Sequence, residues 1–223
     1  MRIEKLSGMA LAAALTLWLG CAADRPAAER PEPAAAEVED GTAEATAPAP
    51  AQEAWWQSLH ALCGEAYAGA LSHGEEADDA FAGQPMTMHV RRCEEARIEV
   101  PFHVGEDRSR TWVLSRTASG IELKHDHRHE DGSEDVLTWY GGHTDSPGTA
   151  VAQLFPADEH SKELFTEQGI PQSTANVWSM EIVPGERFSY LLRRPGRHFQ
   201  VDFDLTEPVE PPPAPWGHEE PGG

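Results

Sequence analysis

Apolar and polar residues alternate over most of the chain from residue 86 to residue 205, with the period of two that is typical of strands with one buried face. The clearest alternating runs are residues 86–90, 98–104, 176–182, 188–192 and 199–205. Pro184-Gly185 and Pro195-Gly196 mark turns between the last three runs. The pattern predicts about nine short strands, joined by tight turns and antiparallel to their neighbours.

Two short helices are predicted beside these strands. Trp55, Leu59 and Leu62 recur at helical spacing before Gly64, which predicts an amphipathic helix ahead of the strands. A second helix is predicted at residues 158–168. The fold class is therefore mainly β, an antiparallel meander that closes into a small lipocalin-like barrel or a sandwich, because closure removes exposed sheet edges.

The stretch from residue 120 to residue 142 is predicted to form a hairpin around Asp131-Gly132, since this pair favours a type I′ turn, which needs φ > 0 at both central residues. One face of its first strand begins apolar and continues as histidines. That face holds Ile121, Leu123, His125, His127 and His129. With this turn, His129 would lie opposite Glu134 and His127 opposite Val136.

Side chains of this hairpin form the candidate metal site of the chain. The candidate ligands are His125, His127, His129 and Glu134. Alternate strand residues point to one side, so imidazoles about 7 Å apart can converge on a transition metal such as zinc. The alternative is a hydrated tip whose charges pair across the strands, as Arg128 and Asp135 would. No catalytic residue is predicted, because the sequence has no G-x-S-x-G motif and no glycine-rich phosphate loop.

Strand residues also provide candidates for an interior binding site. Aromatic residues that could line a ligand cavity, with core packing as the alternative, are Phe102, Trp112, Trp139, Trp178 and Tyr190. Arginines that could line a polar site, or extend to the surface instead, are Arg110, Arg116, Arg193 and Arg194.

The N-terminal segment is typical of export. Residues 1–20 combine an early positive charge with an apolar run too short to cross a bilayer comfortably, which predicts a cleaved signal peptide. Leu19-Gly20-Cys21 resembles the lipobox of bacterial lipoproteins, and that resemblance implies lipidation of Cys21 and a membrane anchor. In that family Ala22, which is not Asp, implies an outer-membrane lipoprotein facing the periplasm.

Composition divides the rest of the chain into three parts. Residues 21–51 are rich in Ala, Pro and Glu and predict a disordered tether. Residues 52–206 predict a single β domain, and residues 207–223 predict a Pro-rich disordered tail. With Cys21 lipidated, Cys63 and Cys93 remain, and an even count in an oxidising compartment favours a disulfide over two buried thiols.

The formal net charge of −21 argues against nucleic acid as a partner, and no basic patch is visible in the sequence. Anionic membrane surfaces are equally poor partners for such a chain. The lipid anchor is then the predicted link to the membrane.

From Met88 to Leu205 the chain resembles an uncharacterised family of exported proteins of Gram-negative bacteria. The resemblance rests on PFHVGEDRSRTWVLSRT, LKHDHRHEDGSED, the NVW at residues 176–178 and RRPGRHFQVDFDLT. It implies a shared fold and no assigned activity. A second, partial resemblance is to the first metal motif of cupins, through Gly120, His127, His129, Glu134 and Gly141. It implies a metal centre in a β-barrel enzyme.

These observations favour a non-enzymatic envelope lipoprotein whose barrel-like domain binds a small ligand or a protein partner. The first alternative is a metal-binding, cupin-like enzyme centred on the hairpin. The second is a structural or assembly partner in the envelope, in which the Pro-rich tail makes the contact.

Overall fold

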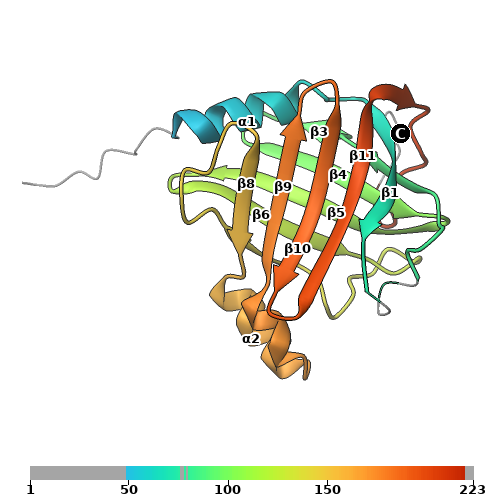
Figure 1. Ribbon diagram of the computed structural model, residues 1–223. Coiled ribbons are helices and arrows are strands. Elements are labelled where there is room, and N and C mark those ends of the chain that lie inside the picture. Colours follow the sequence, from blue (N-terminus) through green and yellow to red (C-terminus); the bar gives the residue numbers. More distant parts are fainter. Residues whose placement is uncertain (1–48, 76–77, 79, 219–223) are drawn as a thin grey trace, which may run out of the picture. The chain divides into compact units, whose positions relative to one another are not determined.

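The computed structural model describes residues 49–75, 78 and 80–218, which belong to one compact unit (Figure 1). The predicted signal peptide, Cys21 and all but the end of the tether lie outside the described residues. No helix within the described part of the chain is long and apolar enough to cross a bilayer.

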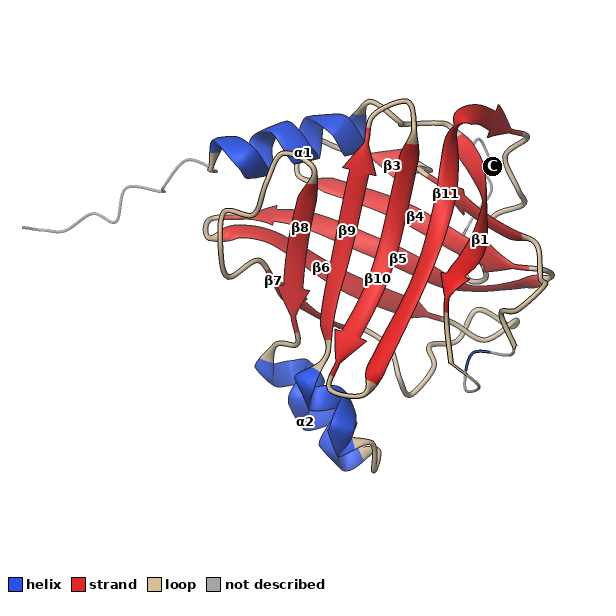
Figure 2. Ribbon diagram, viewed as in Figure 1, coloured by secondary structure: helices blue, strands red, loops and turns tan. Residues whose placement is uncertain are grey.

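Eleven antiparallel strands of the described residues form a single sheet (Figure 2). They are β1 (Ala66–His73), β2 (Met86–His89), β3 (Arg92–Cys93), β4 (Arg97–Val104), β5 (Asp107–Thr117), β6 (Gly120–His127), β7 (Tyr140–His143), β8 (Ala152–Pro156), β9 (Val177–Val183), β10 (Arg187–Arg194) and β11 (Arg197–Val209). Their order across the sheet is β7-β6-β5-β4-β2-β1-β11-β10-β9-β8, with β3 paired beside β4. The last strand returns to the first, so most of the sheet is a meander.

The two outer strands, β7 and β8, meet and nearly close the sheet into a barrel. Gly142 and Ala157 form an isolated bridge, and the amide of Asp158 donates to the carbonyl of Gly141 at 3.0 Å. The strands approach so closely that a Cβ on Gly142 would lie 1.8 Å from the carbonyl oxygen of Pro156. The prediction of a mainly β, antiparallel, barrel-like fold with two short helices is confirmed.

Helix α1 (Pro50–His60) covers one end of the barrel, which we call the α1 end (Figure 1). Its apolar side chains Trp55, Trp56 and Leu59 are fully buried. The indole Nε1 of Trp55 donates to the carbonyl of Met180 at 3.2 Å, so the helix is bonded to a strand of the wall. This end of the barrel is therefore filled by side chains.

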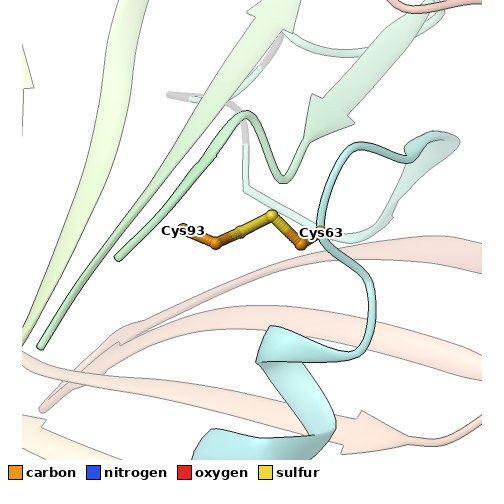
Figure 3. The surroundings of a disulfide bond; sticks show 2 residues. All are labelled: Cys63 and Cys93. Carbon is orange, nitrogen blue, oxygen red and sulfur yellow. A yellow bond between two sulfur atoms is a disulfide. The ribbon is translucent and has the colours of Figure 1, made fainter. Parts of the chain in front are cut away.

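Cys63 and Cys93 form the predicted disulfide, with 6.2 Å between their Cα atoms (Figure 3). The bond joins the turn after α1 to β3. Closing a loop of 30 residues restricts the unfolded chain and contributes about 3 to 4 kcal/mol to stability in the chain-entropy model.

Helix α2 (Glu159–Glu167) and the 3-10 helix η2 (Pro171–Ala175) lie at the opposite end, which we call the α2 end (Figure 2). The side chain of Asp158 caps α2 by accepting from the amide of Ser161 at 2.9 Å. The hydroxyl of Ser161 is in turn hydrogen-bonded to the backbone of Gly141. The helix thus begins at the place where β7 and β8 close the barrel.

The central hairpin differs from its prediction in register and in turn type. His125 lies opposite Tyr140 and Leu123 opposite Gly142, and residues 128–139 form a loop between β6 and β7. Among the described residues other than glycine, only Trp139 has a positive φ, so Asp131-Gly132 does not form a type I′ turn. The carboxylate of Asp131 instead accepts from the amide of Ser133 at 2.9 Å. This local bond favours a wider turn, which shifts the strands out of the predicted register.

The C-terminal segment also differs from the predicted boundary at residue 206. Strand β11 continues to Val209, which lies opposite Ala66, and residues 214–218 contact residues of β5 and β6. The amide of Trp216 donates to the carbonyl of Arg108 at 3.1 Å. Ala214 is buried, so the segment covers apolar surface although its prolines exclude a regular strand. Residues 219–223 lie outside the described part.

Candidate functional site

A cavity of about 470 Å³ lies inside the barrel at the α2 end. Its lining residues from the strands are Phe102, Arg110, Trp112, His125, His127, Tyr140, Trp178, Tyr190, Leu192, Arg194, Arg197 and Phe199. Loops add Asp78, Phe81, Asp135 and Leu137, and the segment from α2 to β9 adds Phe165, Ile170, Ser173 and Asn176. The volume falls in the range of roughly 300 to 1,000 Å³ that is usual for small-molecule sites.

Aromatic rings form much of the cavity wall. The ring of Trp112 stacks on Phe102, with 5.0 Å between centroids, and on Tyr190, with 4.5 Å. On the other side, Trp178 lies 5.7 Å from Tyr140 and 6.5 Å from Phe165. Except for Phe165 on α2, these side chains come from strands whose alternation directs every second residue inward, so the sequence pattern itself builds most of this apolar surface.

His125 is 3% exposed and uses both of its ring nitrogens. Nδ1 lies 3.1 Å from the carbonyl of Tyr140, which can only accept, so Nδ1 carries the hydrogen and Nε2 is the acceptor. The hydroxyl of Tyr190 donates to that Nε2 at 2.8 Å. Burial, and then the neighbouring His127, lower the pKa of His125 to about 3, so the ring is neutral at neutral pH.

His127 lies beside His125 on the same face of β6. Its Nε2 lies 3.2 Å from the hydroxyl of Tyr140. Burial, and then the positive charge of Arg110, lower the pKa of His127 to about 4. Burial also raises the pKa of Tyr140 to about 12. Both imidazoles and both phenols of this wall are therefore uncharged at neutral pH.

Two of the three arginines that line the cavity pair with carboxylates. Nη1 of Arg110 lies 2.6 Å from Asp107, and its guanidinium lies over the ring of Phe81, 5.3 Å from the centroid. Arg197 donates to both carboxylate oxygens of Asp78. Burial opposes the charge on Asp78, but the hydrogen bonds from Arg197 and from the backbone outweigh it and lower the pKa of Asp78. This pair is 14% and 3% exposed and forms part of the cavity wall.

The third arginine, Arg194, has a different partner. Its Nη1 donates to the side-chain oxygen of Asn176 at 3.0 Å. Asn176 ends η2 and starts the turn into β9, so the contact joins the helical segment to the last residue of β10. The two side chains line the cavity together with Ser173.

The four predicted metal ligands lie in different surroundings. His125 and His127 face the cavity, whereas His129 is 57% exposed and lies 3.9 Å from Asp135. Glu134 accepts from the indole of Trp139 at 2.9 Å and also pairs with Arg128. The ligand atoms of the four do not form a group of three within 4.8 Å of one another. The geometry therefore gives the metal hypothesis no support beyond its sequence pattern.

A different trio of potential ligands, Glu122, His143 and Asp158, does come together in the described part of the chain. However, Lys124 places its ammonium group against both carboxylates of this trio. That positive charge neutralises the carboxylates, and it occupies the position where they would attract a metal ion most strongly. We interpret the cluster as an ion-pair network that supports the closure between β7 and α2.

The sequence identified part of the cavity wall and missed the rest. Four of the five aromatic candidates line it, while Trp139 lies in the loop after β6. Of the four arginine candidates, Arg110 and Arg194 line it and Arg116 and Arg193 do not. Arg197 and the loop residues Asp78 and Phe81 were not predicted. Strand alternation can indicate inward residues, but no signal in the sequence indicates which loops fold over a barrel end.

Comparisons of the chain with protein-family models, with curated proteins and with solved structures gave no match.

Proposed function

We propose that this domain binds a small, largely apolar ligand in the cavity at the α2 end, and acts by binding and not by catalysis. The observation that carries the proposal is the contrast between the two ends of the barrel. Tryptophans of α1 fill one end, whereas aromatic side chains at the other surround a volume of about 470 Å³.

The chemistry of the cavity favours binding over catalysis. Both ring nitrogens of His125 are engaged, by the Tyr140 carbonyl and the Tyr190 hydroxyl. His127 is held by the hydroxyl of Tyr140, and its pKa of about 4 makes it a weak base at neutral pH. These groups are already hydrogen-bonded to one another and are poorly suited to transfer a proton.

We propose, as part of the same function, that the binding domain works in the cell envelope. An export signal, lipidation at Cys21 and a tether to residue 51 would hold the domain near the outer membrane, on its periplasmic side. The disulfide between Cys63 and Cys93 is of the kind that persists in an oxidising compartment. A role as an assembly partner through a free Pro-rich tail has less support, because residues 210–218 contact the protein's own barrel.

The test uses N-phenyl-1-naphthylamine, a neutral aromatic probe whose fluorescence increases in apolar surroundings, with the purified full-length chain. We expect saturable binding of one probe per chain. Leu192→Trp adds volume inside the cavity and should weaken binding by about tenfold or more.

Leu154→Trp is the matched control, because Leu154 lies on β8 with 44% of its surface exposed. It should bind the probe as the unchanged protein does. Equal binding by all three proteins, or none by the unchanged protein, would contradict the proposal.

A further inference from the structure

Two arginines face each other at the end of the β10–β11 hairpin. Arg194 and Arg197 are directly paired in the register of the two strands, and Pro195-Gly196 forms the turn between them. Like charges in directly opposed positions destabilise a sheet. The chain therefore holds two guanidinium groups together at an energetic cost, at the α2 end of the cavity.

Among the described residues, only one of these two arginines forms an ion pair. Arg197 has the buried carboxylate of Asp78. Arg194 forms no ion pair within residues 49–75, 78 and 80–218, and its side-chain partner there is the neutral amide of Asn176. The nearby Glu75 is exposed, and its carboxylate accepts from the backbone amide of His198. Its negative charge raises the pKa of Arg194, but by less than burial and Arg197 lower it. Burial, and then the charge of Arg197, lower the pKa of Arg194, as expected for a cation without a strong counter-ion.

Asn176 and Ser173, which carry hydrogen-bond donors, line the same cavity as Arg194. Asn176 uses its side-chain oxygen to accept from the arginine, and within the described part of the chain its amide nitrogen has no acceptor. The hydroxyl of Ser173 also belongs to this part of the lining. A guanidinium group, an amide and a hydroxyl close together are the groups that bind carboxylate and other oxyanions in proteins.

The other carboxylates are placed elsewhere. Asp78 is occupied by Arg197, and Asp107 is occupied by Arg110. Asp135 lies on the loop after β6, where its carboxylate accepts from the amide of Leu137 and lies near His129. Among the described residues, no carboxylate thus forms an ion pair with Arg194, and the charge of the exposed Glu75 only partly offsets its burial.

We infer that the ligand is an aromatic organic anion, whose flat apolar body lies against Trp112, Trp178 and Tyr190 and whose anionic group binds Arg194 and Asn176. This inference rests on the proposed function, since it assigns a chemical class to the ligand of the same cavity. The aromatic wall would supply most of the buried area, and Arg194 would select for charge.

The test compares two probes that share one aromatic framework. N-phenyl-1-naphthylamine is neutral, and 8-anilino-1-naphthalenesulfonate is the same framework with one sulfonate. We expect the purified full-length chain to bind the sulfonate about tenfold or more tightly than the neutral probe, because a hydrogen-bonded charge pair is worth more than a neutral contact.

Arg194→Met should remove this preference while the neutral probe binds as before. Arg193→Met is the matched control, because Arg193 is the exposed neighbour on β10 and the substitution removes the same charge. It should leave the preference unchanged. Arg194→Lys keeps the charge and should retain part of the preference, which separates loss of charge from loss of packing.

The outcomes separate failure of the inference from failure of the proposed function. If the neutral probe binds and the sulfonate binds no more tightly, the domain binds ligands and the inference is wrong. If Arg193→Met and Arg194→Met weaken sulfonate binding equally, only the general charge matters and the inference is again wrong. If neither probe binds, the proposed function itself fails. The comparison in the unchanged protein is decisive even if a variant does not fold.

Discussion

The hydroxyl of Tyr190 donates to Nε2 of His125 across the interior of the barrel, with 2.8 Å between the two atoms. Tyr190 lies on β10 and His125 on β6, and these strands are not neighbours in the sheet. The bond therefore joins two sides of the wall at the edge of the cavity, and it fixes the orientation of both rings.

Tyr190→Phe is expected to destabilise the protein by about 1 to 3 kcal/mol, because it leaves the buried Nε2 of His125 without a donor. Urea unfolding measures the loss. Tyr67→Phe is the matched control, since Tyr67 is buried to a similar degree and no hydrogen bond of its hydroxyl is seen within the described residues. Equal effects of the two substitutions would show that the bond to His125 contributes little.

The stability of the protein is expected to fall as the pH is lowered from about 6.5 to about 4. Five histidines have lowered pKa values in the folded state, and the shift is largest for three of them, to about 3 for His125 and to about 4 for His103 and His127. The unfolded chain takes up protons on these groups below pH 6.5 or so, and the folded chain does not. Each histidine thus lowers the free energy of unfolding by up to about 1.4 kcal/mol for each pH unit below 6.5 or so. This decrease ends when the pH reaches the pKa of the histidine in the folded state.

The pH effect is measured by urea unfolding at pH 7 and pH 5 in the unchanged protein and in two variants. His127→Gln removes one buried group and should reduce the loss of stability between these pH values. His60→Gln changes an exposed histidine at the end of α1 and should leave the loss unchanged. A stability that does not vary between pH 7 and pH 5 would contradict the burial of these imidazoles.

The C-terminal segment is expected to contribute to stability. His218 lies 3.1 Å from the carboxylate of Asp126, which is 2% exposed, and the carbonyl of Ala214 accepts from Arg108 at 3.0 Å. Removing residues 210–223 breaks both contacts and should cost about 1 to 3 kcal/mol. The matched control removes residues 219–223 and keeps these contacts, so it should have no effect on the urea midpoint. Identical urea midpoints for both truncations would show that this segment does not stabilise the barrel.

Much of the barrel follows from local pattern. The parity of β6 predicts that His125 shares a face with Ile121 and Leu123, and all three are buried in the structure. The same reasoning placed Trp112 and Tyr190 among the inward residues. Strand alternation indicates directly which residues are buried, because each residue on the inner face is desolvated when the sheet closes.

Other parts depend on interactions that local pattern does not contain. The register of the β6–β7 hairpin was predicted from a favoured dipeptide, but the Asp131 side chain bonds to Ser133 and the loop to Trp139 then separates the strands. Asp78 lines the cavity because its loop contacts Arg197, which lies more than one hundred residues later in the chain. Such contacts arise from closure of the whole barrel, and the pattern of residues within a short stretch of sequence cannot predict them.

Locating a bound probe shows whether a ligand enters the cavity at the α2 end. Protein labelled with 5-fluorotryptophan gives one ¹⁹F resonance for each tryptophan, and single Trp→Phe variants assign them. With N-phenyl-1-naphthylamine added, we predict that the resonances of Trp112 and Trp178 shift while those of Trp55 and Trp56, at the filled α1 end, do not. If the probe left the resonances of Trp112 and Trp178 unchanged at saturation, it would not bind in this cavity, and the proposed function would be wrong.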